Sequence, residues 1–390
     1  MSTEGVRQRN LARILRLVHL EGPLSRATLT ELTGLNRSTV ADLVGEFVRG
    51  GLVEERAPDP SRRVGRPSPI VSIASRVLAI AVNPEVDALT IAAVGLDRGI
   101  PVRERIDLDR LITPAETAAL VAERISQWRA GPLADARIVA IGLAVPGLVR
   151  VADGLVRNAP HLNWVDEPVR DLVAAATGLP TAVGNDASLG ALAEHLFGAA
   201  RGIDDVVYLN GGASGIGGGL IVHGMPVGGA GGYAGEFGQN RPGIAADSDR
   251  RARGGVLEDE VSRARLLDVV GVGSADEPTL AALLSATEDP AAAAELVRQR
   301  GILATALANA VNVLNPSVVV LGGFLATIAE RDLPGLTAAV SDFAMPASME
   351  GLDIRVAVLA EDRLLIGAAE AAFGELLADP LGLRHRLSVR

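Results

Sequence analysis

The chain has 390 residues, of which 48% are hydrophobic and 22% charged, and its formal net charge is −10. These proportions are those of a globular protein, and the length suggests two or three domains. Cysteine and lysine are both absent, which excludes disulfides, thiolate metal sites, a phosphate-binding lysine and Schiff-base chemistry. We expect no leader peptide, no membrane span and a cytoplasmic protein, because no apolar run follows the first residues and Asn, Pro and Gly interrupt the uncharged stretch 302–329.

Charge divides the chain into two parts. Residues 1–76 hold 12 arginines against 8 acidic residues, whereas the remainder holds 25 arginines against 39 acidic residues. A basic head on an acidic body is expected where one part meets nucleic acid. Because a solvated helix face would give the same count, the sequence pattern has to decide between the two interpretations.

The pattern at the N-terminus predicts three helices. Apolar residues at helical spacing favour a first helix over 6–20, which Gly22 and Pro23 end. Ser25 and Asn36 are suited to cap a second helix that ends at Gly34 and a third that ends at Gly50. Two helices joined by so short a turn are typical of a helix-turn-helix, in which the second helix faces the major groove with its first residues. We expect DNA contacts from Ser25, Asn36, Arg37, Ser38 and Thr39.

A wing is predicted after the third helix. Short strands are expected over 52–56 and 70–73, with a Pro- and Arg-rich segment between them. The guanidinium of Arg66, beside Arg62 and Arg63, suits a narrow A·T-rich minor groove. The alternative is a solvated linker between domains; the order of helix-turn-helix and wing favours DNA binding. We place this winged helix-turn-helix domain at residues 1–75.

The remainder of the chain alternates strand-like and helical runs, which predicts an α/β domain. Several of the strands end in glycine-rich turns, at 142–147, 211–219 and 322–323, where the backbone can approach a ligand closely. The predicted strands are 77–82, 89–94, 138–143, 206–210, 317–321 and 354–359, and the predicted helices are 115–129, 168–176, 187–196, 301–314 and 363–377.

Seven short motifs occur in the order seen in the ROK family, which comprises repressors, open reading frames and sugar kinases. Together with the winged head, they make the chain resemble a ROK transcriptional regulator. The resemblance implies an α/β, actin-like (RNase H-like) ROK domain over 76–390, with a sugar cleft between a first lobe (76–200 and helix 363–378) and a second (201–362). The motifs are GLAVPG at 142–147, NAP at 158–160 with NW at 163–164, GNDA at 184–187, the glycine-rich 211–219, GEFG at 235–238, NP at 315–316 with LGG at 321–323, and IGAA at 366–369.

The resemblance also points to a lost phosphate site. Family kinases carry an Asp-x-Gly-x-Thr turn for magnesium and phosphate where this chain reads VNPEVD at 82–87. Pro84 removes an amide donor and Asn83 replaces the metal-binding carboxylate, so we expect no ATP binding, no enzyme activity and no cofactor. The second glycine-rich segment, with Gly211, Gly212, Ser214 and Gly217, remains; phosphate binding and tight packing are both open for it.

A structural zinc site is implied for the family, through a Gly-Glu-x-Gly-His motif and a three-cysteine loop. Here Gln239 stands at the histidine position, and the segment 240–257 has no cysteine, with Val256 where the last would fall. We therefore expect no metal, since His161, His195 and His223 are also far apart in sequence. The stretch 250–253 is either held by salt bridges or mobile.

The sugar cleft retains more of the family pattern. Asn185 and Asp186 match the kinase residues that hold the sugar, the aspartate as general base; without a phosphate donor Asp186 would only accept a hydrogen bond. Glu236 and Glu258 match family glutamates, and ionised carboxylates accept the hydrogen bonds that sugar hydroxyls donate. Gln239 can still hydrogen-bond but carries no charge, so specificity is altered or lost. The candidate sugar-binding residues are Asn163, Asn185, Asp186, Glu236, Gln239 and Glu258.

These expectations combine into a sequence-specific DNA-binding transcriptional regulator, a repressor, whose degenerate kinase-like domain senses a sugar or sugar derivative. Its expected partners are an inverted-repeat operator, the sugar, and further copies of the chain in a homodimer or homotetramer, with no membrane. A sugar between Asp186 and Glu236 would close the lobes and re-aim the heads. Two alternatives stay open: an active ATP-dependent sugar kinase with a DNA-binding head, and a regulator that binds no sugar.

Overall fold

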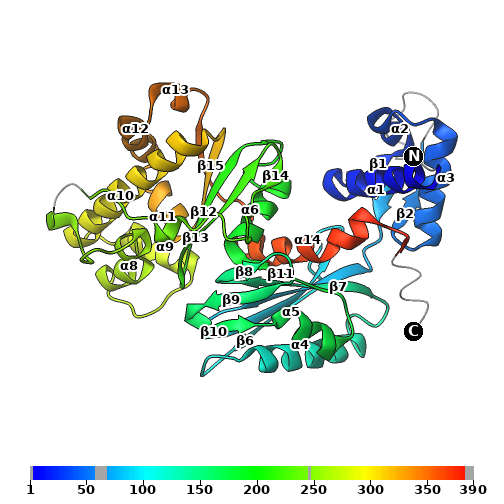
Figure 1. Ribbon diagram of the computed structural model, residues 1–390, viewed down its shortest axis with the longest axis horizontal. Helices are drawn as coiled ribbons and strands as arrows, with labels where there is room; N and C mark the ends of the chain where they lie inside the picture. The colour runs from blue at the N-terminus through cyan, green and yellow to red at the C-terminus, as the bar shows by residue number, and fades with distance from the viewer. Residues whose placement is uncertain (1–2, 58–67, 245–246, 383–390) are drawn as a thin grey trace. The chain divides into compact units, whose positions relative to one another are not determined.

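The computed structural model describes residues 3–57, 68–244 and 247–382, and its contacts divide the chain into two units (Figure 1). Unit 1 comprises 1–143, 169–183 and 368–390, and unit 2 comprises 144–168 and 184–367. This division differs from the lobes expected from sequence, because the helix that starts at Asp186 packs on the sheet of unit 2. Among the described residues, no helix combines the length and the apolar character needed to cross a membrane.

Three helices and a three-stranded antiparallel sheet form the head, residues 3–57 and 68–75, within unit 1. The second and third helices begin where the sequence predicts: Ser25 Oγ accepts a hydrogen bond from Thr28 N (3.0 Å), and Asn36 Oδ1 accepts one from Thr39 N (2.8 Å). The segment 58–67, with Arg62, Arg63 and Arg66, lies outside the described residues. The elements are α1 (Thr3–Glu21), α2 (Arg26–Thr33), α3 (Arg37–Arg49) and the strands β1 (Leu24–Ser25), β3 (Ile70–Ile73) and β2 (Val53–Arg56), in that sheet order.

Arginine contacts fix the turn between α2 and α3. Arg13 of α1 donates from Nη2 to Leu32 O (2.7 Å) and from Nη1 to Thr33 O (2.8 Å). These carbonyls belong to the last turn of α2 and have no partner within the helix, so the guanidinium satisfies them where the chain reverses. Arg26 at the start of α2 is also ion-paired with Glu55 on β2.

A buried histidine joins the head to the rest of unit 1. His19 is 1% exposed; its Nδ1 lies 2.6 Å from Leu96 O, and its Nε2 lies 3.1 Å from Glu370 Oε2. Glu370 belongs to α14 (Arg363–Ala378). Arg137 makes a second connection by donating to Gly50 O (2.9 Å). Polar contacts to two elements distant in sequence therefore hold the head in unit 1.

The first five-stranded sheet forms the rest of unit 1, with α4 and α5 packed against each other beside it (Figure 1). The central β4 pairs in parallel with β7 and antiparallel with β5. Neither edge strand, β11 or β6, was predicted; in β6 the Arg and Glu residues hide the apolar alternation. In sheet order the strands are β11 (Thr181–Asn185), β7 (Arg137–Val145), β4 (Val77–Pro84), β5 (Ala88–Gly95) and β6 (Val102–Asp107), and the helices are α4 (Pro114–Arg129) and α5 (Val169–Thr177).

Unit 2 contains the second five-stranded sheet and most of the helices. Its strands, in sheet order, are β14 (Met225–Pro226), β13 (Gly215–Val222), β12 (Val206–Gly212), β15 (Val318–Gly323) and β16 (Asp353–Val356). A small sheet has the order β10 (Trp164–Glu167), β9 (Leu155–Ala159) and β8 (Leu148–Arg150). The helices are α6 (Asp186–Phe197), α7 (Leu257–Glu260), α8 (Arg263–Val269), α9 (Glu277–Ala286), α10 (Pro290–Leu314), α11 (Phe324–Glu330), α12 (Leu333–Phe343) and α13 (Pro346–Met349).

The glycine-rich segment 211–219, expected to be a turn, is mostly strand. The turn of the β12–β13 hairpin lies between Gly212 and Gly215. The glycines after this turn lie in β13, which packs against α6. A Cβ atom at Gly217 would lie 2.6 Å from Ala187 Cβ, and one at Gly219 would lie 2.5 Å from Ala191 Cβ. Close packing, one of the two interpretations left open by the sequence, accounts for these two glycines.

We predict that Gly219→Ala destabilises the protein. The added Cβ must displace α6 or β13, which costs about 1–3 kcal/mol for an overpacked core. Gly301→Ala is the matched control: Gly301 lies exposed in α10 with nothing within 4 Å of the added Cβ, so helix propensity should make that variant more stable by about 0.5–1 kcal/mol. Urea unfolding measures both, and equal stability of the two variants would contradict the packing argument.

Candidate functional site

A cavity of about 370 Å³ lies within unit 2, where the start of α6, the β12–β13 hairpin and the segment 236–258 converge. It brings together five of the six residues that the sequence analysis selects for sugar binding: Asn185, Asp186, Glu236, Gln239 and Glu258. The sixth, Asn163, is exposed at the left-handed end of the short helix Pro160–Leu162 and does not line this cavity. Asn158, His161 and Asn210, to which the sequence gave no site role, also line it, as does Ser214 of the segment for which phosphate binding was left open.

Asn185 and Asp186 reach the cavity because a strand ends and a helix begins there. Asn185 caps α6: its Oδ1 accepts a hydrogen bond from Ser188 N (2.9 Å), and its Nδ2 donates to Gly147 O (3.0 Å). Asp186 accepts one bond on Oδ1 from Ala187 N (2.8 Å). Asn185 therefore fixes the local backbone, whereas Asp186 places a carboxylate in the cavity.

Burial and neighbouring charges shape the acidity of the cavity. Burial raises the pKa of Asp186 to about 6; the Ala187 N–H lowers that pKa, the Glu236 charge raises it and the Arg363 charge lowers it. Burial, followed by the charge of Glu258, also raises the pKa of Glu236. Above about pH 6 the carboxyl group of Asp186 is therefore ionised, so it adds a negative charge to the cavity and accepts hydrogen bonds.

Glu258 is held at both carboxylate oxygens. Oε2 accepts a hydrogen bond from Ile216 N (3.1 Å), and Oε1 accepts one from Gln239 Nε2 (2.6 Å). Gln239 thus turns an N–H group toward Glu258, whereas a zinc ligand must offer a lone pair. With Val256 at the position of the last cysteine, these residues do not fit the zinc ion that the family resemblance implies.

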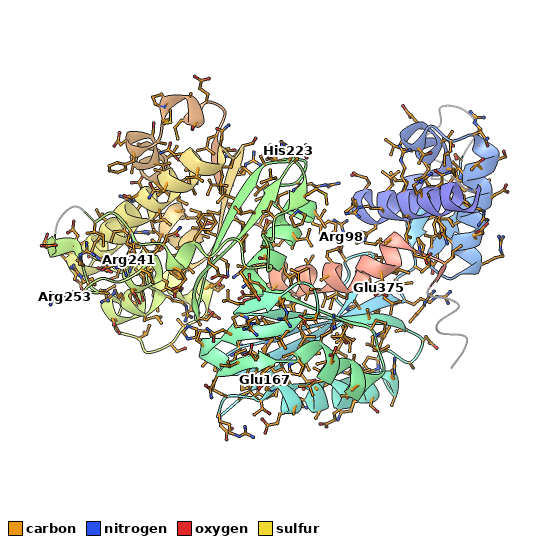
Figure 2. The ribbon with its side chains drawn as sticks, viewed as in Figure 1. Arg98, Glu167, His223, Arg241, Arg253 and Glu375 are labelled. Atoms are coloured by element: carbon orange, nitrogen blue, oxygen red, sulfur yellow. The ribbon has the colours of Figure 1, made fainter. Side chains whose placement is uncertain are left out.

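The histidines do not supply another metal centre. Figure 2 shows His223 at the turn between β13 and β14, where it is exposed. His161 lines the cavity, while His195 lies in α6. Over residues 3–57, 68–244 and 247–382, no cluster of three or more His, Asp or Glu side chains is arranged to hold a metal ion.

The turn between β4 and β5, in unit 1, is the segment that the family resemblance matches to the kinase phosphate loop. Glu85 N donates to Ala88 O (2.8 Å), and Asn83 Nδ2 donates to Glu85 Oε1 (2.7 Å). Glu85 and Asp87 are also ion-paired with Arg105. The Glu85 amide and the Asn83 side chain are therefore engaged within the turn, and the turn carries the carboxylates of Glu85 and Asp87.

Of the residues selected for DNA contact that the structure describes, Ser25 precedes α2, whereas Asn36, Arg37, Ser38 and Thr39 lie at the start of α3. Arg37 and Ser38 are exposed, and Ser38 Oγ donates to Asn36 Oδ1 (2.8 Å). Ser25 and Asn36 use their side-chain oxygens to cap α2 and α3, so their observed role is structural. Among the selected residues that the structure describes, Arg37 is the one that presents a positive charge to solvent.

We predict that the cavity couples the titration of Asp186 to Glu236. The pKa of Asp186 should fall toward its ordinary value in Glu236→Gln, because a like charge is removed. Carbon-13 NMR of the carboxyl groups measures this shift. Glu350→Gln, an exposed site in the same unit, should leave the pKa of Asp186 unchanged, and an equal effect of the two variants would refute the coupling.

Asp186 should also make stability depend on pH. Its folded pKa of about 6 lies above its unfolded value, so its stabilising contribution is complete below about pH 4 and is lost as the pH rises through 6. Asp186→Asn lacks this titration, so its free energy of unfolding should gain about 2 kcal/mol relative to wild type between pH 4 and 7. Urea unfolding at a series of pH values measures the difference; a difference that does not vary with pH would contradict the assignment.

Known proteins resemble either most of the chain or a part of it. The ROK family model matches residues 80–374. The chain is 26% identical to the xylose repressor of Caldicellulosiruptor bescii, over 96% of this chain and 98% of the repressor. It is 30% identical to a glucokinase of Halalkalibacterium halodurans, over 59% of this chain and 74% of the kinase.

A solved structure resembles the chain over its whole length. The crystal structure of a ROK family transcriptional regulator, a homolog of the Escherichia coli MLC protein, has a TM-score of 0.77 and 23% identity. The similarity covers 99% of this chain and 100% of that one, so the fold includes the head as well as the α/β body. The family match spans most of the chain and both α/β sheets, and the protein is therefore a member of the ROK family.

Proposed function

We propose that the protein is a DNA-binding transcriptional regulator, a repressor, that responds to a sugar held in the cavity of unit 2. The observation that carries this proposal is the presence, in one chain, of a head that exposes Arg37 at the start of α3 and a cavity that gathers Asp186, Glu236 and Glu258. The xylose repressor, similar over 96% of the chain, supports the same combination.

The chemistry of the cavity favours an uncharged sugar. Its volume of about 370 Å³ lies at the lower end of the usual range for small-molecule sites and suits a monosaccharide. Three carboxylates accept hydrogen bonds from hydroxyl groups, and no arginine is among the lining residues that the structure describes. A sugar phosphate would face like charges there, so we propose a neutral monosaccharide as the ligand.

Helix α14 is the proposed route from ligand to head. Arg363, at its start in unit 2, donates from Nε to Asn210 Oδ1 (3.1 Å), and Asn210 lines the cavity. Glu370, two turns later in unit 1, contacts His19 of the head. A ligand that displaces Asn210 would therefore move the helix that holds the head. Movement of the head would in turn change the spacing of paired heads along the operator.

The enzyme alternative, raised by the glucokinase similarity, is less well supported. Catalysis by a sugar kinase needs a cradle for the nucleotide phosphates, whereas the turn after β4 uses Glu85 N within its own hairpin and places Glu85 and Asp87 beside it. ATP-dependent sugar phosphorylation that Asp186→Ala abolishes would overturn the proposal in favour of a kinase.

We predict that calorimetry with a panel of pentoses, hexoses, N-acetylhexosamines and their phosphates finds a neutral sugar that binds. Asp186→Ala and Glu236→Gln should each weaken that binding at least tenfold, because each removes hydrogen-bond acceptors worth about 1.5–3 kcal/mol when charged. Asn163→Gly, outside the cavity, is the control and should bind normally. A panel without binding would favour a regulator that senses no sugar, and tighter binding of a phosphate would contradict the charge argument.

We predict that Arg37→Ala weakens binding to duplexes selected by the wild-type protein from a random pool. If Arg37 contacts a phosphate, the variant should also lower the slope of log affinity against log salt by about 1. Arg49→Ala, exposed in the last turn of α3, is the control and should bind as wild type does. Equal effects of Arg37→Ala and Arg49→Ala would remove the start of α3 from the DNA interface.

A further inference from the structure

A buried polar cluster lies on α10, outside the cavity. Glu295 is 8% exposed, Arg298 9% and Gln299 0%. Arg298 and Gln299 contact the segment 249–262, and Glu295 binds both of them. Glu260, on that segment, is fully buried beside them. Charged groups so deeply buried must be paired, since isolated burial would cost several kcal/mol for each ion.

Arg298 uses its whole guanidinium in this cluster. Nε and Nη2 donate to the two carboxylate oxygens of Glu295 (2.8 and 2.6 Å). Nη1 donates to Glu260 Oε2 (3.0 Å) and Asp249 O (2.9 Å), and Nη2 donates to Glu260 O (2.6 Å). These contacts match the five N–H groups of an arginine, so a lysine could not replace it.

The segment is tied to this arginine through its backbone. The Glu260 carboxylate accepts hydrogen bonds from Arg251 N (3.0 and 2.9 Å) and from Ala252 N (2.9 Å). On the other side of α7, Gln299 accepts from Ser262 N (3.0 Å) and donates to Ser262 O (3.1 Å). The sequence left open whether the stretch 250–253 is held in place or mobile. In the structure, the hydrogen bonds to Arg251 N and Ala252 N hold its backbone.

The outer side of the segment is also connected. Arg241 Nη1 donates to Gly254 O (3.3 Å), and Figure 2 shows Arg241 and Arg253 on the same side of unit 2. Leu257 N donates to Asn240 O (2.8 Å), which connects the start of α7 to the end of the short helix that carries Gln239. The anchored segment is therefore continuous with one wall of the cavity.

Helix α7 joins the cluster to the cavity. It is one turn long, and Glu260 enters the cluster whereas Glu258, two residues earlier, lines the cavity and contacts Gln239. Any tilt of α7 that breaks the Glu260 contacts must move Glu258 as well. One short helix therefore carries a residue of the cluster and a residue of the cavity.

We propose that Arg298 is a positioning residue: by binding Glu260, Glu295 and the backbone of Asp249, it holds the segment 249–262 without a metal ion and sets Glu258 in the cavity. The part of this inference that concerns the ligand rests on the proposed function. The part that concerns the segment does not.

The electrostatics agree with an anchor that stays charged. Burial opposes ionisation of Glu260, but the N–H groups of Ala252 and Arg251 and the charge of Arg298 outweigh it and lower the pKa of Glu260. Burial is likewise outweighed at Glu295, where hydrogen bonds from Arg298 and Gln299 lower the pKa. A neutral residue at position 298 would leave two buried carboxylates without their counter-ion.

Hydrogen exchange on the full chain tests the anchor. In Arg298→Met, the amides of Arg251 and Ala252 should exchange at least tenfold faster than in wild type, while amides of β12 and β15 keep their protection. Arg298→Lys should resemble Arg298→Met, and millimolar guanidinium should restore protection to Arg298→Ala. Arg300→Met is the matched control, because Arg300 lies on the same helix but pairs with Asp332 (3.0 Å).

Two outcomes of this experiment would overturn the anchor. One is unchanged protection of Arg251 and Ala252 in Arg298→Met; the other is loss of their protection in wild type when EDTA removes divalent metal. If Arg298→Met does not fold, the effect of guanidinium on Arg298→Ala tests the anchor instead. Failure of guanidinium to restore protection of Arg251 and Ala252 would then overturn it.

Calorimetry with the neutral sugar that binds most tightly to wild type tests the positioning of Glu258. Arg298→Met and Glu258→Gln should each weaken binding at least tenfold, and the double variant should be no weaker than the worse single variant. The positioning role would be overturned if the losses of sugar affinity in the two single variants added up in the double variant. It would also be overturned if Arg298→Met bound the sugar normally while its Ala252 amide exchanged fast. A wild-type protein that binds no sugar would refute the proposed function, while the exchange experiment would still decide on the anchor.

Discussion

The close approach of α6 to β13 is the constraint on which the site depends. Gly217 and Gly219 let the helix come so near that a methyl group at either position would overlap Ala187 or Ala191. The start of α6 is thereby fixed beside the β12–β13 hairpin, and Asp186 is the first residue of that helix. A larger residue at either position would have to displace α6 or β13, and a displaced α6 carries the Asp186 carboxylate with it.

Buried polar groups give the rest of the structure its specificity. Apolar residues with few aromatics form the core, and such a core fixes position less sharply than directional contacts do. Three buried or half-buried groups supply direction: Arg298 in the segment beside the cavity, Arg363 at the start of α14, and His19 between the head and α14. Each joins elements that are distant in sequence, and none belongs to a metal site.

Local signals made the head predictable. The caps at Ser25 and Asn36 and the left-handed Gly34 act within a few residues, so the sequence alone places α2 and α3 correctly. The sequence predicts this helix only over 301–314, and it gives no sign that Glu295, Arg298 and Gln299 in the first half of α10 are buried, because such residues are usually exposed. Only contacts with residues 249–262, far away in the chain, show that this face is buried.

The site was partly predictable for the same reason. Asp186, Glu236, Gln239 and Glu258 belong to short motifs that a family resemblance can identify, and the structure brings them into one cavity. Asn163 was selected for its place beside Trp164, but its left-handed backbone at the end of a short helix leaves it exposed outside that cavity. The engagement of Gln239 with Glu258 depends on the fold of the segment between them, which no local pattern encodes.

We propose that one free energy couples the cavity to the head, and reciprocal titration measures it. The dissociation constant for a selected operator is measured without and with saturating neutral sugar, and that for the sugar is measured without and with saturating operator. Both constants should change by the same factor, of about 5 or more, as linkage requires. Sugar and operator that bind the same protein without changing each other's affinity would contradict it.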